Sequence, residues 1–231
     1  MPVFDFSLLL SGHYHDLLLT GFLFSLQLMG ITLLFALPLA VLVALMRLSD
    51  WRVLRRGSWL FVETIRNVPL LAHMLFWYFG MPELLPDGLK EWLYAGNFEA
   101  VAAVCALTLY TAAYMSEDIR SGIRAIPQVQ FEAGRALGFG FISTMRLVIL
   151  PQALRVTVPP LISQTLNLWK NTSIATVIGT AELMYQASKM ETETFRSFEA
   201  FTFATFSYLT VSLLITGLAA WYQHRYPVRL L

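Results

Sequence analysis

The chain has 231 residues, of which 57% are hydrophobic and only 13% are charged, and its net charge is +1. A soluble domain usually carries about 25% charged residues, so this composition predicts a protein surrounded mainly by lipid. The near-neutral balance gives no reason to expect nucleic acid as a partner. The single cysteine, Cys105, has no internal disulfide partner, and no Cys or His spacing indicates a metal or haem site, so we expect neither metal nor cofactor.

Five apolar stretches are long enough to cross a bilayer, which takes about 20 residues per helix. The predicted fold class is therefore all-α integral membrane, with five transmembrane helices in one domain covering residues 1–231. Pro38 inside the first stretch should kink that helix rather than end it, because lipid tolerates no exposed loop. No basic residue precedes this stretch and no cleavage site follows it, so we expect it to be retained and not removed as a signal peptide. The predicted spans are about 17–46, 59–79, 98–122, 151–178 and 201–222.

Basic residues divide unequally between the two sides of these spans. Three of them, Lys90, Lys189 and Arg196, lie on one side, and eleven lie on the other. Because cytoplasmic loops retain Lys and Arg, the N-terminus should be outside and the C-terminus in the cytoplasm. The eleven are Arg47, Arg52, Arg55, Arg56, Arg120, Arg124, Arg135, Arg146, Arg155, Arg225 and Arg229.

The segments between the spans differ in character. Residues 80–97 contain two prolines and three glycines and should form a loop with a short helix at most. Residues 179–199 contain four glutamates and are predicted to be a polar loop. Residues 123–150 are too polar to cross lipid but rich in helix formers, which predicts a structured cytoplasmic loop.

This cytoplasmic loop should consist of two short helices joined by a glycine turn. Residues 130–137 form the first, Gly138 and Gly140 break it, and residues 141–149 form the second. Pro151 then opens the next span, where a missing N–H costs little. Exposed apolar residues at a membrane surface indicate a partner or lipid. The alternative is an interfacial helix packed on its own domain.

Polar residues recur at helical spacing inside three of the spans. A charge at membrane depth costs at least about 2.5–3.5 kcal/mol, so each needs a partner or a polar pathway. A Glu63–Arg66 ion pair, an aromatic packing stripe and polar contacts between helices are local explanations. One shared water-filled cavity explains all three stripes together. The residues are Glu63, Arg66 and Asn67, then Tyr110, Tyr114 and Glu117, and finally Gln164, Asn167 and Asn171 with Lys170 beside them.

The cytoplasmic loop reads QFEAGRALGFGFISTMRLVILP over residues 130–151. It resembles the EAA loop of ATP-binding-cassette import permeases, with the pattern E-A-A-x3-G-x9-I-x-L-P. Gly134 replaces the third residue, an alanine, and Val148 replaces the isoleucine. The resemblance implies that this loop forms coupling helices that dock into a groove on a cytoplasmic ATPase. The residues implied in this coupling are Glu132, Ala133, Gly134, Gly138, Leu150 and Pro151.

The flanking segments TLYTAAYMSEDIRSGIRAIP, LWKNTSIATVIG and ETIRNVPLLAHMLFWYFGMPELLP are similar to the polar amino-acid branch of that family. That similarity implies a permease in the bacterial cytoplasmic membrane. Within the branch, the similarity is greatest to permeases that import glutamate or aspartate. It also implies three kinds of protein partner: a second permease copy or paralogue, two ATPase subunits and a periplasmic amino-acid binding protein.

The chain itself offers no nucleotide site. A phosphate-binding loop needs a glycine followed by Lys and then Ser or Thr, and none of the three lysines follows a glycine. We therefore expect a transport subunit without catalytic residues, driven by ATP hydrolysis on another polypeptide.

The sequence argues against two other classes of membrane protein. An intramembrane enzyme would need a Ser/His pair, paired Asp residues or HExxH within the spans, and the sequence has none of these sets. A passive channel or structural membrane protein has no need of a docking loop with this spacing.

A transported amino acid carries a carboxylate and an ammonium group, so its path needs a buried cation and an anion. Apart from Arg120 and Arg155 near span ends, Arg66 and Lys170 are the only basic residues within spans, and we expect them to bind carboxylates. Glu117, near Tyr114 and Asn171, is the predicted partner of the ammonium. Glu63 is the alternative, or else the partner of Arg66.

Overall fold

The computed structural model describes residues 6–227, so Arg229 lies outside the described residues. Within this range every regular element is helical. The α-helices are α1 (Ser7–Leu10), α2 (His13–Leu48), α3 (Arg52–Arg66), α4 (Leu70–Leu75), α5 (Asp87–Tyr94), α6 (Phe98–Arg124), α7 (Gln128–Ala136), α8 (Phe141–Thr144), α9 (Leu150–Asn171), α10 (Leu183–Thr194) and α11 (Ser197–Arg225). The π-helical turns are η1 (Phe76–Gly80) and η3 (Met145–Ile149), and the 3-10 helices are η2 (Met81–Leu84) and η4 (Thr172–Ile178).

The chain divides into two compact units, each built from three separate stretches. Four of the five boundaries fall inside α2, α6, α9 and α11, so each of these long helices contributes a part to each unit, and the fifth falls at the end of α3. Unit 1 is Met1–Phe35, Asn67–Tyr110 and Asn167–Leu214, and unit 2 is Ala36–Arg66, Thr111–Leu166 and Ile215–Leu231.

Four helical stretches among the described residues are long and apolar enough to cross a membrane. They cover the predicted first, third, fourth and fifth spans. The first continues through Pro38, and the stretch at the fourth span continues through two adjacent prolines. The four are His13–Leu48, Phe98–Arg124, Phe141–Ile178 and Ser197–Arg225.

The predicted second span, residues 59–79, is not one continuous helix. The α3 helix ends at Arg66 and α4 begins at Leu70. Pro69 has no N–H to donate, and its ring disfavours helical backbone at Val68, which is why the helix stops here. The prediction of a single second helix is therefore wrong, and a total of five membrane crossings stays a prediction.

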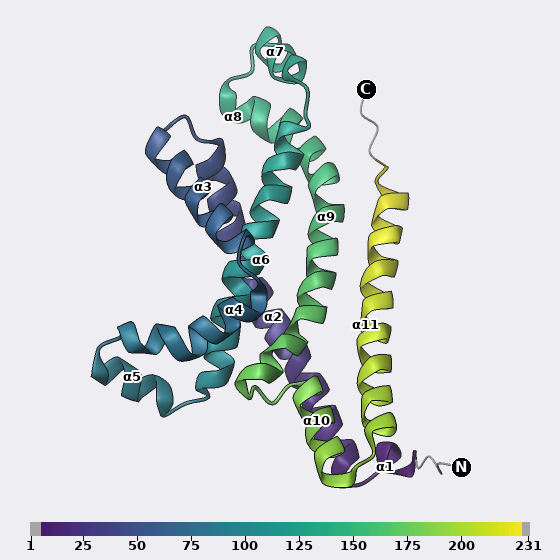
Figure 1. The fold of residues 1–231 in the computed structure, drawn as a ribbon. Coiled ribbons are helices and arrows are strands. Elements are labelled where there is room, and N and C mark those ends of the chain that lie inside the picture. The colour runs from purple at the N-terminus through teal and green to yellow at the C-terminus, as the bar shows by residue number, and fades with distance from the viewer. Residues whose placement is uncertain (1–5, 228–231) are drawn as a thin grey trace. The chain divides into compact units, whose positions relative to one another are not determined.

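Two more segments differ from expectation. The predicted polar loop at residues 179–199 contains α10, whose first turn is capped by Glu182. Residues 141–149 were predicted to form a short helix of their own, but α8 passes through η3 directly into α9. Proline in the first turn of a helix loses no hydrogen bond, so α9 can continue the helix before it. By contrast, the short helix expected within residues 80–97 is confirmed as α5, which turns back beside the preceding helix (Figure 1).

Two apolar clusters lie among the described residues of unit 1. The larger one packs α4, α6 and the end of α9 around Met74, Leu107 and Leu168. The second packs α2, α10 and α11 around Leu18 and Met190. Aromatic side chains in and beside these clusters hold the elements together, as in the edge-to-face contact of Phe22 with Trp169 at 6.1 Å.

A buried carboxylate links the helices of the second cluster. Glu182 is 0% exposed, and it accepts hydrogen bonds from the backbone N–H groups of Met184 (2.9 Å) and Tyr185 (2.8 Å). The hydroxyl of Tyr208 on α11 donates to it at 2.9 Å, and that of Ser25 on α2 at 3.3 Å. Burial raises the pKa of Glu182, although these hydrogen bonds oppose the shift. One side chain therefore fastens α2, α10 and α11 together.

Unit 2 is held by close approach of its helices. Ile149 and Ala153 pack with Ile126 where α6 ends and α9 begins. At Gly122 on α6, a Cβ atom would lie 1.9 Å from Oγ1 of Thr157 on α9. Only glycine allows this contact, because it has no Cβ atom. The Thr157 side chain of α9 therefore packs directly on the backbone of α6.

Replacing Glu182 by Ala should destabilise the protein strongly. The change leaves two backbone N–H groups and two hydroxyls without their acceptor, and each buried unsatisfied group costs about 1–3 kcal/mol. Tyr208→Phe removes one donor only and should cost less. Thermal unfolding of the purified protein measures both, with Glu193→Ala on the exposed face of α10 as the control. A wild-type melting temperature for Glu182→Ala would contradict this role.

Candidate functional site

The α7 and α8 helices lie beside each other at one end of unit 2 (Figure 1). After α7 the backbone turns at Gly138, whose φ of +80° is readily adopted only by glycine. Phe139 N–H donates to Gly134 O at 3.0 Å and Gly138 N–H to Arg135 O at 2.9 Å. These two bonds form a Schellman motif, which satisfies the last carbonyls of the helix. The predicted helix–glycine turn–helix is thus confirmed.

Gly134 is the point where α7 touches α8. It is buried, and a Cβ atom there would lie 2.6 Å from Cγ2 of Thr144. Alanine, which the resemblance led us to expect at this position, would therefore push α8 away. The glycine accommodates a threonine on the facing helix.

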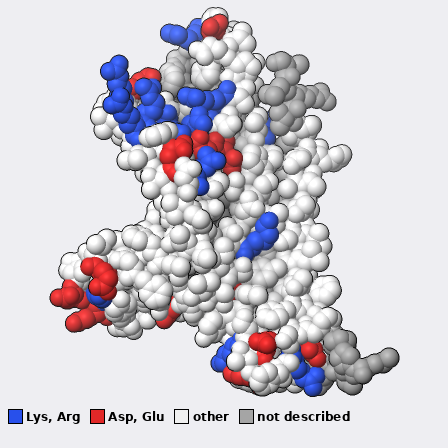
Figure 2. Space-filling model, in the orientation of Figure 1, with Lys and Arg blue, Asp and Glu red and all other residues white. Residues whose placement is uncertain are grey.

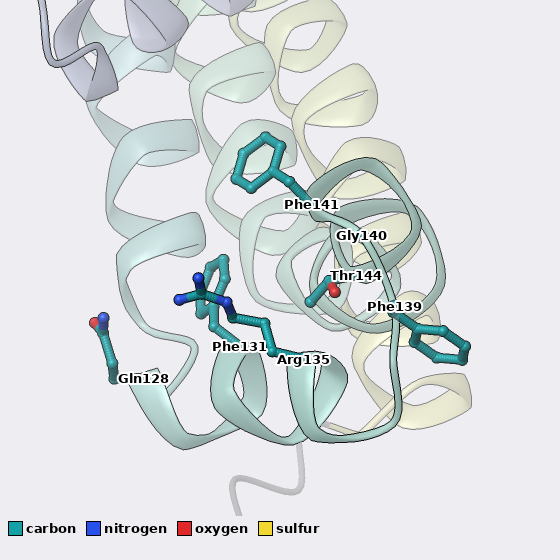
Figure 3. A pocket seen from close by; sticks show the side chains of 7 residues that line it. All are labelled: Gln128, Phe131, Arg135, Phe139, Gly140, Phe141 and Thr144. Atoms are coloured by element: carbon teal, nitrogen blue, oxygen red, sulfur yellow. The ribbon is translucent and has the colours of Figure 1, made fainter.

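A hollow of about 550 Å³ lies between the two helices. Phe131 and Arg135 project into it from α7, and Phe141 stands at its edge (Figure 3). Phe141 is 74% exposed, and its neighbours Leu137 and Ile142 are exposed to a similar degree. An apolar surface of this kind beside a guanidinium is typical of a protein interface. The hollow is lined by Gln128, Phe131, Arg135, Phe139, Gly140, Phe141 and Thr144.

The other residues predicted to take part in coupling are accessible. Glu132 and Ala133 are exposed on α7, and Leu150 and Pro151 are exposed at the start of α9. Gly138 is exposed in the turn. These five residues can therefore meet a partner directly, whereas the buried Gly134 can act only through the packing of α7 on α8.

Charge separates sharply between the units. Among residues 6–227, unit 2 holds eleven basic and five acidic residues, and unit 1 holds four basic and nine acidic residues. In Figure 2 the basic side chains gather over α3 and the neighbouring ends of unit 2, and acidic ones gather around α5 in unit 1. The α7–α8 loop therefore belongs to the basic unit.

The nine residues of the predicted substrate path divide between the units. Unit 2 contains Glu63, Arg66, Tyr114 and Glu117, and unit 1 contains Asn67, Tyr110, Asn167, Lys170 and Asn171.

Within unit 2, the structure brings Arg66 and Tyr114 together. The guanidinium carbon of Arg66 lies 4.9 Å from the centroid of the Tyr114 ring, which is a cation–π contact. This contact joins α3 to α6 through one residue of each predicted polar stripe.

Glu117 is bound by two arginines. Its carboxylate accepts from Arg47 at 3.0 Å and from Arg120 at 2.6 Å. Its negative charge is thus compensated by side chains of the same unit. The i,i+3 spacing of Glu117 and Arg120 could have indicated one of these pairs. The sequence held no signal for Arg47, which lies 70 residues away along the chain.

Asp118 was missed as a polar residue of α6. Gln164 on α9 hydrogen-bonds its carboxyl group, and Arg66 interacts with it electrostatically. The spacing of Tyr114 and Asp118, i and i+4, could have revealed that they share a helical face.

Within unit 1, α4 packs against η4. Tyr110 on α6 forms an edge-to-face contact with the buried ring of His73 on α4 at 6.2 Å. Asn171 occupies the position just before η4 without capping it by a side-chain hydrogen bond, while Asn167 and Lys170 are exposed. The structure thus joins Tyr110 to α4, and Asn171 lies at the end of an element that contacts the same helix.

This combination defines a class of protein: a membrane protein with several long apolar helices and an exposed pair of short helices, α7 and α8, between two of them. The chain belongs to the family of binding-protein-dependent transport system inner membrane components, whose model matches residues 36–227. It is 37% identical over 211 residues to the probable glutamine ABC transporter permease protein GlnM of Bacillus subtilis, covering 90% of this chain and 88% of the relative.

Two other similar proteins also belong to amino-acid ABC transporters. The glutamate/aspartate import permease protein GltJ of Escherichia coli is 37% identical over 160 residues, which cover 68% of this chain and 65% of the relative. A crystal structure of an amino acid ABC transporter with histidines is 29% identical, with a TM-score of 0.85, covering 97% of this chain and all of that one. The predicted resemblance to ABC import permeases is thus confirmed, and such relatives are transport components rather than enzymes.

Gly134→Ala should destabilise unit 2, because the new methyl group meets Thr144 at overlapping distance. Overpacking of this kind costs about 1–3 kcal/mol. Thr144→Ala removes the obstacle, and the threonine hydroxyl accepts and donates no hydrogen bond within the described residues.

The double variant should be at least as stable as Thr144→Ala alone, since alanine favours a helix over glycine by about 1 kcal/mol. Thermal unfolding of the three variants forms the double-mutant cycle that tests this contact. Purely additive effects would show that Gly134 and Thr144 do not interact.

Proposed function

We propose that this chain is the membrane-spanning subunit of an ATP-driven importer for a polar amino acid, with glutamate or aspartate as the first candidates. The observation that carries this proposal is the family match together with relatives named for glutamine and for glutamate/aspartate transport. Two cations at span positions, Arg66 and Lys170, suit a substrate with two carboxylates. An amide such as glutamine would use only one of them in this way.

The α7–α8 loop is the proposed contact with the ATPase. Three observations support it: the exposed apolar residues around the hollow, the Schellman turn that fixes the helix pair, and a sequence without a nucleotide-binding loop. Glu132, Ala133, Leu150 and Pro151 present the surface, and Gly134 and Gly138 shape it.

The basic character of unit 2 supports a cytoplasmic position for this loop. Positively charged segments are retained on the cytoplasmic side of a membrane, and unit 2 carries most of the basic residues. The proposed orientation in the bacterial inner membrane therefore has the N-terminus outside and the C-terminus inside.

The proposed assembly contains four further proteins. A second permease subunit, identical or paralogous, completes the pathway, two ATPase subunits supply the energy, and a periplasmic binding protein delivers the amino acid. The family description itself names dependence on a binding protein.

The proposed pathway uses the polar residues that the sequence predicted for it. Arg66 and Lys170 attract carboxylates, and Asn67, Tyr110, Asn167 and Asn171 offer hydrogen-bonding groups without charge. Tyr114 supports Arg66 through its ring. Glu63 remains a candidate for the ammonium end. Glu117 has less capacity for this role, because Arg47 and Arg120 already occupy its carboxylate.

Reconstitution of the complete complex in liposomes tests this function. With binding protein outside and ATP trapped inside, labelled glutamate or aspartate should accumulate. Accumulation should stop when ADP replaces ATP. Equal movement of the amino acid without ATP would support a passive channel instead and would contradict the proposal.

Gly138→Val should interrupt coupling in the same preparation. A β-branched residue is strained at φ +80° by about 1–3 kcal/mol, so the turn should open and misplace α8. We expect normal membrane abundance, weaker co-purification of the ATPase and uptake reduced at least about tenfold. Gly57→Ala is the matched control, because Gly57 lies within α3, away from the hollow, and has open space around it. Full uptake by Gly138→Val would remove the loop from its proposed role.

A further inference from the structure

Four side chains of unit 2 gather between α3, α6 and α9. Arg66 on α3 lies over the ring of Tyr114 on α6 at 4.9 Å. One helical turn further along α6, Asp118 shares the face of Tyr114, because residues four apart on a helix are neighbours. Gln164 on α9 hydrogen-bonds the Asp118 carboxyl group, and Arg66 is near enough to interact with it electrostatically.

The two adjacent acids of α6 are in opposite situations. Glu117 is bound by both Arg47 and Arg120, with three hydrogen bonds from Arg120 alone. In Asp118, Oδ2 is buried and accepts no hydrogen bond from the described residues. A carboxylate has about four acceptor sites, so Asp118 retains capacity that Glu117 has already used.

A buried carboxylate oxygen without a hydrogen-bond donor, such as Oδ2 of Asp118, does not stabilise the fold. A buried polar atom without a partner destabilises the fold, and ionisable groups within spans mark pathways for polar substrates. The nearby guanidinium and the Gln164 amide make the surroundings of Asp118 polar, which suits a zwitterion better than an apolar ligand.

We propose that Asp118 binds the α-ammonium group of the transported amino acid and that Arg66 binds its α-carboxylate. An ammonium group has three donors for the open carboxylate oxygen and its neighbours, and the guanidinium fork matches a carboxylate in two parallel hydrogen bonds. The Tyr114 ring holds the Arg66 guanidinium in place between transport cycles. This inference rests on the proposed function, and it assigns to Asp118 the role that the sequence suggested for Glu117.

The test is the number of amino acids transported per ATP hydrolysed, measured with the complete complex in liposomes. Asp118→Asn keeps the shape of the side chain and removes its charge. It should lower this ratio at least about tenfold, because the substrate loses a charge-assisted hydrogen bond. Asp118→Glu keeps the charge and should recover part of the ratio. Asp50→Asn, at an exposed position of the same unit, is the matched control and should keep the wild-type ratio.

Two results would overturn the assignment. A wild-type ratio for Asp118→Asn would show that the substrate does not use this carboxylate. Uptake and ATP hydrolysis falling together, with the ratio preserved and less assembled complex, would make Asp118 a structural partner of Arg66 and Gln164. Failure of the wild-type complex to move any polar amino acid with ATP is a different result. That result would refute the proposed function, and with it this inference.

Discussion

A charge or a backbone group that is buried away from water needs a partner within the protein, and this constraint explains how several polar side chains of the chain are arranged. Glu182 is completely buried yet receives hydrogen bonds from two backbone N–H groups and two hydroxyls. Glu117 is neutralised by two guanidinium groups. A buried charge that is bound on all sides stabilises one arrangement of helices, since removing a single partner leaves an uncompensated charge. Asp118 differs because one of its oxygens is not bound in this way.

The second recurring device is close contact at glycine. Gly122 brings α6 against Thr157, and Gly134 brings α7 against Thr144. Helices in membranes gain little from hydrophobic burial against each other, so contact at small residues becomes important for their association. The α7–α8 pair therefore rests on a rigid packing contact at Gly134 and a fixed turn at Gly138. A rigid pair of this kind can pass a displacement from a partner to α9, which continues directly from η3.

Local signals in the sequence were sufficient for several features. Hydropathy located four of the predicted spans, and the glycine at position 138 identified the turn between α7 and α8. The interruption of the second predicted span at Pro69 was missed because the prediction followed the hydropathy of residues 59–79 and gave no weight to the proline, which does break the helix. Helix α10 was missed because its polarity resembles that of a loop, although buried Glu182 caps it. The pairing of Arg47 with Glu117 depends on packing between distant parts of the chain, so no local pattern could predict it.

The position of the α7–α8 loop relative to the membrane is the central claim, since a loop outside the cell could not meet an ATPase. It is tested most directly by single cysteines introduced into a Cys105→Ser background and treated with an impermeant thiol reagent outside intact cells. Ser143 on α8 and Thr192 on α10 are both exposed on the protein surface, so labelling reports their side of the membrane. The charge distribution predicts that Thr192→Cys is labelled and that Ser143→Cys is labelled only after the cells are opened. Labelling of Ser143→Cys in intact cells would contradict the proposed orientation and the coupling role of the loop.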